Sequence, residues 1–167
     1  MSLDMPKHIL FDFSPSADLS NWRVIDDGVM GGLSQGHFHI NDAGHGHFSG
    51  KVSLENNGGF SSLRFYFNKM KVNDFTKINI VLKGDQKDYQ VRLKSTRYDR
   101  HSYTKTISTS GEWQTITILL SDMTPTFRGR TLNMPNYPGE HLSEFAILIG
   151  NKRAELFDFE IDTIFLT

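Results

Sequence analysis

Apolar and polar residues alternate with a period of two near the C-terminus of the chain. One side of this alternation consists of Phe157, Phe159, Ile161, Thr163 and Phe165, and acidic residues separate the first four of them. Successive side chains of a β-strand point to opposite faces, so this pattern predicts a strand with the apolar set in the core and Asp158, Glu160 and Asp162 in water. No segment of ten or more residues keeps the i, i+3, i+4, i+7 apolar spacing of an amphipathic helix.

Similar short patterns recur along the rest of the chain, separated by glycine- and asparagine-rich turns. The predicted strands are Ile9–Phe13, His37–Ile40, His47–Leu54, Leu63–Phe67, Lys77–Lys83, Tyr89–Ser95, Thr104–Ser108, Trp113–Leu120 and Phe145–Ile149. Many short strands with no helices between them favour an antiparallel sandwich over βαβ units. We therefore predict an all-β protein, a single antiparallel β-sandwich of the jelly-roll type.

Composition favours one packed domain and excludes several chemistries. Of 167 residues, 38% are hydrophobic and 13 are Phe, which is enough apolar material for one core. We expect residues 1–6 to form a tail and 7–167 a single domain. The chain has no cysteine, which excludes disulfides, thiolate metal centres and a cysteine nucleophile. Its 18 basic residues are balanced by 19 acidic ones, so we expect no specific nucleic-acid partner.

The longest apolar run, Phe145–Ile149, is far too short to cross a membrane. The N-terminus carries Asp4 and Asp12 and has no apolar leader pattern. These features predict a cytoplasmic protein with no transmembrane segment, one that could still contact a membrane-bound partner peripherally.

Residues 121–141 show no strand alternation and contain three prolines. Connections of this length are typically functional or disordered. Since arginine and aromatic side chains are frequent anchors of protein interfaces, we take Phe127, Arg128, Arg130 and Tyr137 as candidate contacts with a protein partner. The alternative is that Phe127 fills the core and one arginine pairs internally with Asp27 or Asp85.

Four histidines, His37, His39, His45 and His47, lie within eleven residues. If they flank a hairpin whose loop has an odd number of residues, all four share one face, and Phe38, Ile40 and Phe48 share the other. Such a cluster could hold Zn²⁺ or Ni²⁺, but no acidic ligand is evident nearby. We interpret it as a solvent-facing surface and predict no metal or other cofactor.

Two further segments have a functional and a structural interpretation. Residues 92–105 contain five basic residues with interleaved tyrosines. This segment could bind an anionic partner, or its basic residues could simply form the solvent-facing side of a strand. Residues 22–32 contain Trp22, the carboxylates Asp26 and Asp27, and Met30 among glycines. The carboxylates could bind a ligand, yet neighbouring residues on an extended chain point apart, and a structural turn with Trp22 and Met30 in the core is the alternative.

An enzyme is a weaker interpretation. Gly32–Gly36 fits the G-x-S-x-G pattern of serine hydrolases, but a strand pattern follows it where that motif requires a helix. The remaining candidates, His101, Asp26 and Ser34, belong to no motif that places a base beside a nucleophile. We predict no catalytic residues.

Several motifs together resemble the complex I intermediate-associated protein 30 family. They are Trp22, Asp26–Gly32 with Ser34, Phe48 and Gly50, Asn56–Phe60 with Ser62 and Arg64, Gly84-Asp85 with Tyr89, Gly111–Trp113 and Phe127–Arg130. The resemblance implies a galactose-binding-like jelly-roll, and Gln86 departs from it where the family often has glycine. With little sequence outside the domain, the chain looks most like the bacterial members.

The resemblance also implies a role. Family members help to assemble respiratory complex I (NADH:ubiquinone oxidoreductase) without catalysing a reaction, so we expect a chaperone-like, protein-binding module with Asp26, Asp27, Met30, Phe127, Arg128, Arg130 and Tyr137 as candidate contacts. The alternative is a carbohydrate-binding module using Trp22, Asp26, Asp27, Tyr137 and Arg128. If both Trp22 and Trp113 were buried, that alternative would lose its stacking surface.

Overall fold

The computed structural model describes residues 6–167, with the side chains of Val29 and Met30 outside that description. Most of the predicted tail, residues 1–6, lies outside it too. The strands are β1 His8–Asp12, β2 Trp22–Asp26, β3 Gln35–Ile40, β4 Gly46–Val52, β5 Ser61–Lys71, β6 Lys77–Lys83, β7 Asp88–Lys94, β8 Ser102–Ser108, β9 Trp113–Leu119, β10 Thr124–Phe127, β11 Arg130–Thr131, β12 His141–Ile149 and β13 Glu155–Leu166. Three short 3₁₀ helices are described, η1 Asp27–Met30, η2 Glu55–Asn57 and η3 Leu120–Asp122.

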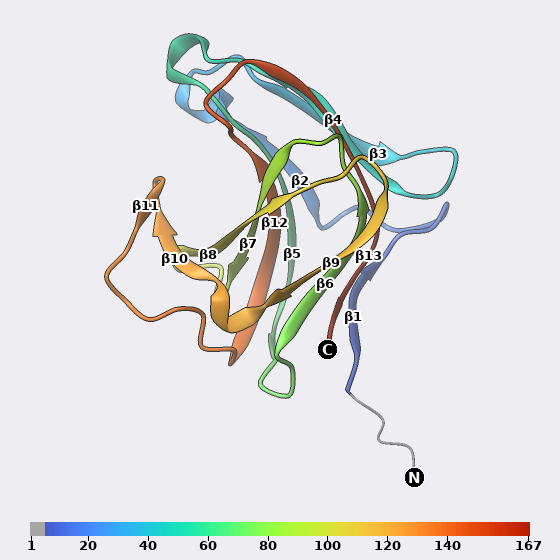
Figure 1. The fold of residues 1–167 in the computed structure, drawn as a ribbon, viewed down its shortest axis with the longest axis vertical. Coiled ribbons are helices and arrows are strands. Elements are labelled where there is room, and N and C mark those ends of the chain that lie inside the picture. The colour runs from blue at the N-terminus through green and yellow to red at the C-terminus, as the bar shows by residue number, and fades with distance from the viewer. Residues whose placement is uncertain (1–5) are drawn as a thin grey trace.

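The strands form two antiparallel sheets (Figure 1). The six-stranded sheet has the order β3-β4-β13-β6-β9, with β1 also paired to β13, and the seven-stranded sheet has the order β11-β10-β8-β7-β12-β5-β2. The prediction of an all-β antiparallel sandwich is confirmed, and each predicted strand overlaps an observed one. The segment 121–141, which shows no strand alternation in the sequence, contains β10 and β11, and η3 overlaps its start.

Aromatic side chains from both sheets fill the core at one end. Trp22 stacks on Phe65 with ring centroids 4.7 Å apart and an interplanar angle of 12°, and Phe11 meets both rings edge-on. Fully buried Phe48 and Phe159 continue the core between the sheets. Burial of Trp22 agrees with the structural interpretation of residues 22–32.

One predicted side-chain orientation was wrong. The pairing of β13 with β6 slips by one residue between Ile161 and Thr163, and a bulge of this kind reverses which side chains face the core. After the bulge Ile164 and Leu166 are fully buried, while Phe165 lies on the outer side beneath the ammonium of Lys7.

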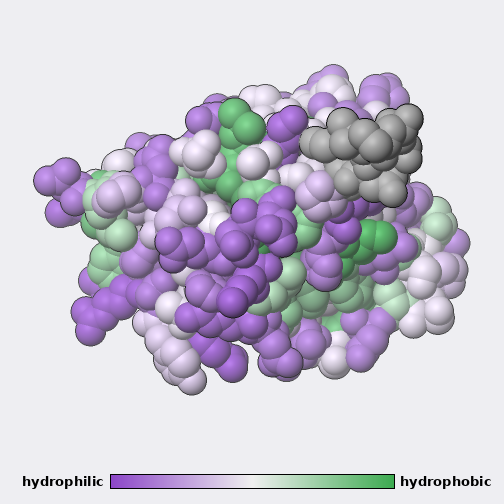
Figure 2. Space-filling model, turned by 90° about the horizontal axis from the view of Figure 1, so that it is seen from below, coloured by the Kyte–Doolittle hydropathy of each residue, from purple (hydrophilic) through white to green (hydrophobic). Residues whose placement is uncertain are grey.

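Trp113 is 41% exposed, because the inward positions of β9 are Ile116 and Ile118. In the view of Figure 2 the surface is mainly hydrophilic, with smaller hydrophobic areas between the polar side chains. Among residues 6–167, no helix is long and apolar enough to span a bilayer.

These positions predict contrasting mutant stabilities. Phe159→Ala should lower the free energy of unfolding by about 3–5 kcal/mol, since it removes a fully buried ring. Trp113→Ala should cost less than about 1 kcal/mol, because much of the indole is already in water. Urea denaturation of both variants checks this, and equal losses would contradict the observed orientation of β9.

Candidate functional site

The carboxylate of Asp27 is fully buried and holds three segments together. Oδ1 accepts the backbone N–H of Ser34 at 2.9 Å. Oδ2 accepts the Ser34 hydroxyl at 2.5 Å and the backbone N–H groups of Gly59 at 2.6 Å and Phe60 at 3.2 Å. Burial alone would raise the pKa of Asp27, but these hydrogen bonds outweigh it and lower the pKa. The charged carboxylate therefore ties η1 to the start of β3 and to the start of β5.

Two glycines pack directly against this carboxylate. A Cβ at Gly32 would lie 2.4 Å from Cγ of Asp27, and one at Gly58 would lie 2.5 Å from its Oδ2. Neither position has room for a side chain. The two glycine-rich strings of the sequence, residues 26–32 and 56–60, are therefore parts of one structural unit centred on Asp27.

Asp26 is also used inside the fold. Its Oδ2 accepts the N–H of Gly36 at 3.0 Å and its Oδ1 accepts the Ser61 hydroxyl at 2.5 Å. Ser34 is buried, and its hydroxyl donates to Asp27 and accepts the N–H of Ser53 at 2.9 Å. The third enzyme candidate, His101, has its Nε2 3.3 Å from the Tyr103 hydroxyl. Asp26, Asp27 and Ser34 thus bind other parts of the chain, and Met30, the remaining candidate here, has its side chain outside the description.

The candidates on the 121–141 segment separate into an exposed pair and a buried residue. Phe127 pairs with Arg130 across a two-residue turn, with φ of 51° at Arg128 and 78° at Gly129, the positive values that a type I′ hairpin requires. Both arginines are exposed, and the guanidinium of Arg128 lies 5.2 Å from the centre of the Phe127 ring. Within residues 6–167 neither arginine forms an ion pair with Asp27 or Asp85.

Tyr137 occupies a different environment. It is 3% exposed, packs against Tyr103 and donates its hydroxyl to the carbonyl of His141 at 2.5 Å. We therefore revise its expected role from partner contact to anchor of the 121–141 segment.

The four histidines share the outer face of the six-stranded sheet, as the odd-loop geometry predicts. His39 pairs with His47, their rings 5.1 Å apart, and Phe38 pairs with Phe48 on the inner side. The acidic residues of β13 lie on the same face, with His47 Nε2 2.8 Å from Asp158, and the His45 ring packs at a tilt against Trp113 with ring centroids 4.5 Å apart. In the described part of the chain, no three His, Asp or Glu side chains are grouped closely enough to hold a metal ion.

The outer face of the seven-stranded sheet carries a set of side chains that the sequence could not place together. One row of cross-strand neighbours consists of Arg23, Arg64, Ala146, Arg92, Thr104 and Thr124. Arg23 is exposed, while Arg64 and Arg92 are half-buried. Burial and the neighbouring charge of Arg64 lower the pKa of Arg92. The pKa of Glu144 beside them is raised by its burial, although the surrounding cations oppose this.

The row leads into a shallow hollow at the edge of this sheet. Its volume is about 380 Å³ and its lining, mostly hydroxyl-bearing, consists of Gln90, Thr104, Lys105, Thr106, Asp122, Thr124, Thr126 and Thr131. The arginine hairpin of β10 and β11 lies at the same edge. We call this row, the hollow and the hairpin the arginine face, and it is the candidate functional site.

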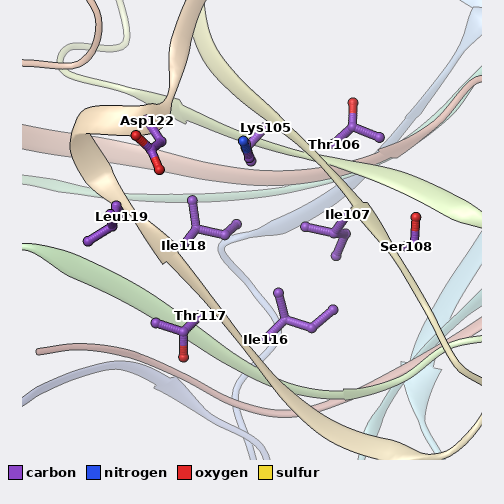
Figure 3. Close-up of a pocket in the computed structure, with 9 residues that line it drawn as sticks. All are labelled: Lys105, Thr106, Ile107, Ser108, Ile116, Thr117, Ile118, Leu119 and Asp122. Atoms are coloured by element: carbon purple, nitrogen blue, oxygen red, sulfur yellow. The ribbon is translucent and has the colours of Figure 1, made fainter.

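A second groove of about 410 Å³ separates β8 from β9 (Figure 3). Ile107, Ile116 and Ile118 gather between the two strands, and Lys105 and Asp122 lie at one end. It adjoins the hollow of the arginine face, since both are lined by Lys105, Thr106 and Asp122.

Residues 11–161 match the family model of Complex I intermediate-associated protein 30. The chain belongs to this family. The glycine-rich strings that carry the resemblance are the ones built around Asp27. A search of curated proteins found no relative that matches.

Solved structures with the same fold include carbohydrate-binding modules. The family 11 module from Clostridium thermocellum, solved with a β-1,3-1,4-mixed-linked tetrasaccharide, has a TM-score of 0.69 and 15% identity over 96% of this chain and 94% of that one. The family 11 module of a cellulosomal cellulase of the same organism has a TM-score of 0.69 and 14% identity, covering 98% of this chain and 95% of that one. An agarase has a TM-score of 0.62 and 11% identity over 96% of this chain but 24% of its own. At these identities the likeness confirms the galactose-binding-like jelly-roll fold.

The Asp27 hydrogen bonds predict an acid-sensitive fold. Because the pKa of Asp27 is below its ordinary value of 3.8, the folded state binds fewer protons than the unfolded state as the pH falls through that value. The free energy of unfolding should therefore fall with pH below about 4. Asp27→Asn should lose roughly 1.5–3 kcal/mol at pH 7 and show a shallower acid dependence.

Denaturant titrations from pH 2 to 7 measure both effects. Asp18→Asn is the control, since Asp18 is exposed and has its own lowered pKa, and this variant should keep the contribution of Asp27. Ser34→Ala, which removes a single donor to Asp27, serves if Asp27→Asn does not fold. An unchanged acid slope in both Asp27→Asn and Ser34→Ala would contradict this assignment.

The histidine face predicts little response to metal. Equimolar Zn²⁺ should leave the melting temperature almost unchanged. A ligand stabilises the folded state only when its concentration exceeds its Kd, and we expect these histidines to bind Zn²⁺ weakly. Differential scanning calorimetry checks this. A rise of many degrees that is abolished in His39→Ala with His47→Ala would refute the solvent-facing interpretation.

Proposed function

We propose that this protein is a non-catalytic binding module that recognises a protein assembly intermediate of respiratory complex I. Family membership supports the assembly role. The observation that carries the binding assignment is the hairpin of β10 and β11, which presents two exposed arginines with no ion-pair partner among residues 6–167. Arginine forms bidentate hydrogen bonds with carboxylates and is enriched among the residues that dominate binding energy.

The chemistry of the remaining candidates supports binding without catalysis. Asp26, Asp27 and Ser34 direct their oxygens to backbone and hydroxyl groups of the fold itself. A serine nucleophile needs an adjacent base and an accessible hydroxyl, and Ser34 is buried against a carboxylate already engaged by four donors. In this proposal the domain acts in the cytoplasm and reaches membrane-bound intermediates from their surface.

A second candidate function is carbohydrate binding. The hollow on the arginine face favours it, since hydroxyl and amide groups of Thr104, Thr126 and Gln90 line it and suit the hydroxyls of a sugar. The stacking surface is reduced, however. Trp22 is buried in the core and Trp113 lies on the opposite sheet.

A pull-down from the source organism's lysate, with membranes solubilised, tests the proposal. The wild-type protein should recover complex I subunits, and Arg128→Ala with Arg130→Ala should recover roughly tenfold less, because losing one strong contact of about 1.4 kcal/mol has that effect. Both residues are exposed, so the melting temperature of the variant should stay close to that of wild type.

Lys51→Ala with Lys77→Ala is the matched control, since it removes the same charge from exposed positions on the other sheet. Its recovery should equal that of wild type. Recovery of no complex I subunit by wild type, together with binding to a mixed-linked β-glucan, would replace the proposal with the second candidate. A large loss of stability in the arginine variant would show that the hairpin is structural.

A further inference from the structure

We infer that the arginine row on the seven-stranded sheet binds an acidic, extended segment of the protein partner. This inference deepens the proposed function and rests on it. It assigns a contact surface to Arg23, Arg64 and Arg92, and it specifies the partner by its charge.

Strand pairing places these arginines in line. Arg23 lies opposite Arg64, and Ala146 lies between Arg64 and Arg92, each on a neighbouring strand. Strands are separated by about 4.8 Å, so the three arginines span roughly 14 Å across the sheet. The row then continues through Thr104 and Thr124 into the hydroxyl-lined hollow.

The charge of this surface is unbalanced. Lys94 and Arg97 add two cations close to the row, and their charges act on Glu144. Glu144 is 5% exposed, and Asp88 at the start of β7 is the other carboxylate on the outward positions of β5, β7 and β12. Two carboxylates cannot neutralise five cations, so the surface attracts an anionic partner.

Part of the arginines' hydrogen-bonding capacity is unused. Arg92 directs Nε and Nη2 to Oε1 of Gln90 at 3.1 and 2.7 Å, and Arg64 directs Nε to the Ser62 hydroxyl at 3.4 Å. The other guanidinium N–H groups of Arg64 and Arg92 have no acceptor among residues 6–167. Gln90 therefore fixes the orientation of Arg92, and the remaining N–H groups of both arginines are available to a carboxylate of the partner.

The side chains of this face favour a protein segment over a sugar. Tyr66 is the one aromatic residue on the outward positions of β5, β7 and β12, and it is half-buried beside Glu144. No tryptophan lies on this face of the described chain to stack on a sugar ring.

The length of the row fits a short peptide. The row from Arg23 to Thr124 crosses five inter-strand steps, about 24 Å, which matches roughly seven residues of extended peptide.

Fluorescence anisotropy with a fluorescein-labelled peptide of seven glutamates tests the inference. Wild type should bind it, more weakly as salt rises, and Arg64→Gln with Arg92→Gln should raise the Kd at least roughly tenfold. Lys51→Gln with Lys77→Gln, which changes the net charge equally, should stay within about twofold of wild type. Arg64→Lys with Arg92→Lys keeps the charge but loses the planar fork, and serves if the glutamine variant does not fold; it too should bind several-fold more weakly.

Three results of the binding experiment would overturn the inference. They are no binding by wild type, equal weakening in the arginine and lysine variants, and tighter binding of an oligogalacturonate of equal charge at the same arginines. The pull-down separates this inference from the proposed function. Recovery of complex I subunits that is unaffected by Arg64→Gln with Arg92→Gln would leave the function standing and reject the arginine row. Peptide binding without recovery of complex I would support the row and reject the assembly role.

Discussion

The fold depends on one buried carboxylate. Asp27 accepts four hydrogen bonds from residues that lie up to 33 positions away in sequence, and it joins the end of β2 to the starts of β3 and β5. Burying a charge is costly unless it is hydrogen-bonded, and here Oδ1 accepts one hydrogen bond and Oδ2 accepts three. Gly32 and Gly58 have to be glycine because the carboxylate occupies the space of a Cβ. The motif that identifies the family is therefore a structural device, and it is not where we expect the partner to bind.

The residues that define the family are therefore different from those that we propose contact the partner. Asp26 and Ser34 belong to the structural unit, while the arginine face lies on the outer side of the seven-stranded sheet. The hairpin with Arg128 extends one edge of that face, and the row with Arg64 and Arg92 crosses its middle. A binding module needs such a surface with accessible donors and a stable scaffold beneath it.

Alternation in the sequence was sufficient to predict most of the fold, because half-buried strands expose one face to water. The register of the histidine hairpin followed from the need to bury Phe38 and Phe48 together. The orientation of Phe165 could not be predicted, since a one-residue bulge in the pairing of β13 with β6 reverses the pattern locally and leaves no sequence mark. The family often has glycine at position 86, and this preference indicates a turn with positive φ. Gln86 adopts a φ of 67°, a conformation that glycine adopts more readily.

Less of the site was predictable. Arg92 and Lys94 were recognised as the wet side of a strand, but their neighbours Arg23 and Arg64 come from β2 and β5, and only the strand order brings them together. Sequence reasoning likewise cannot tell that Tyr137 turns inward.

The most direct test of the account is arginine-specific labelling with phenylglyoxal, read by mass spectrometry, on the protein alone and bound to its captured partner. Binding should protect Arg23, Arg64 and Arg128 and leave exposed Arg153, in the turn between β12 and β13, unchanged. Protection of Arg153 with no change at Arg64 and Arg128 would contradict the account.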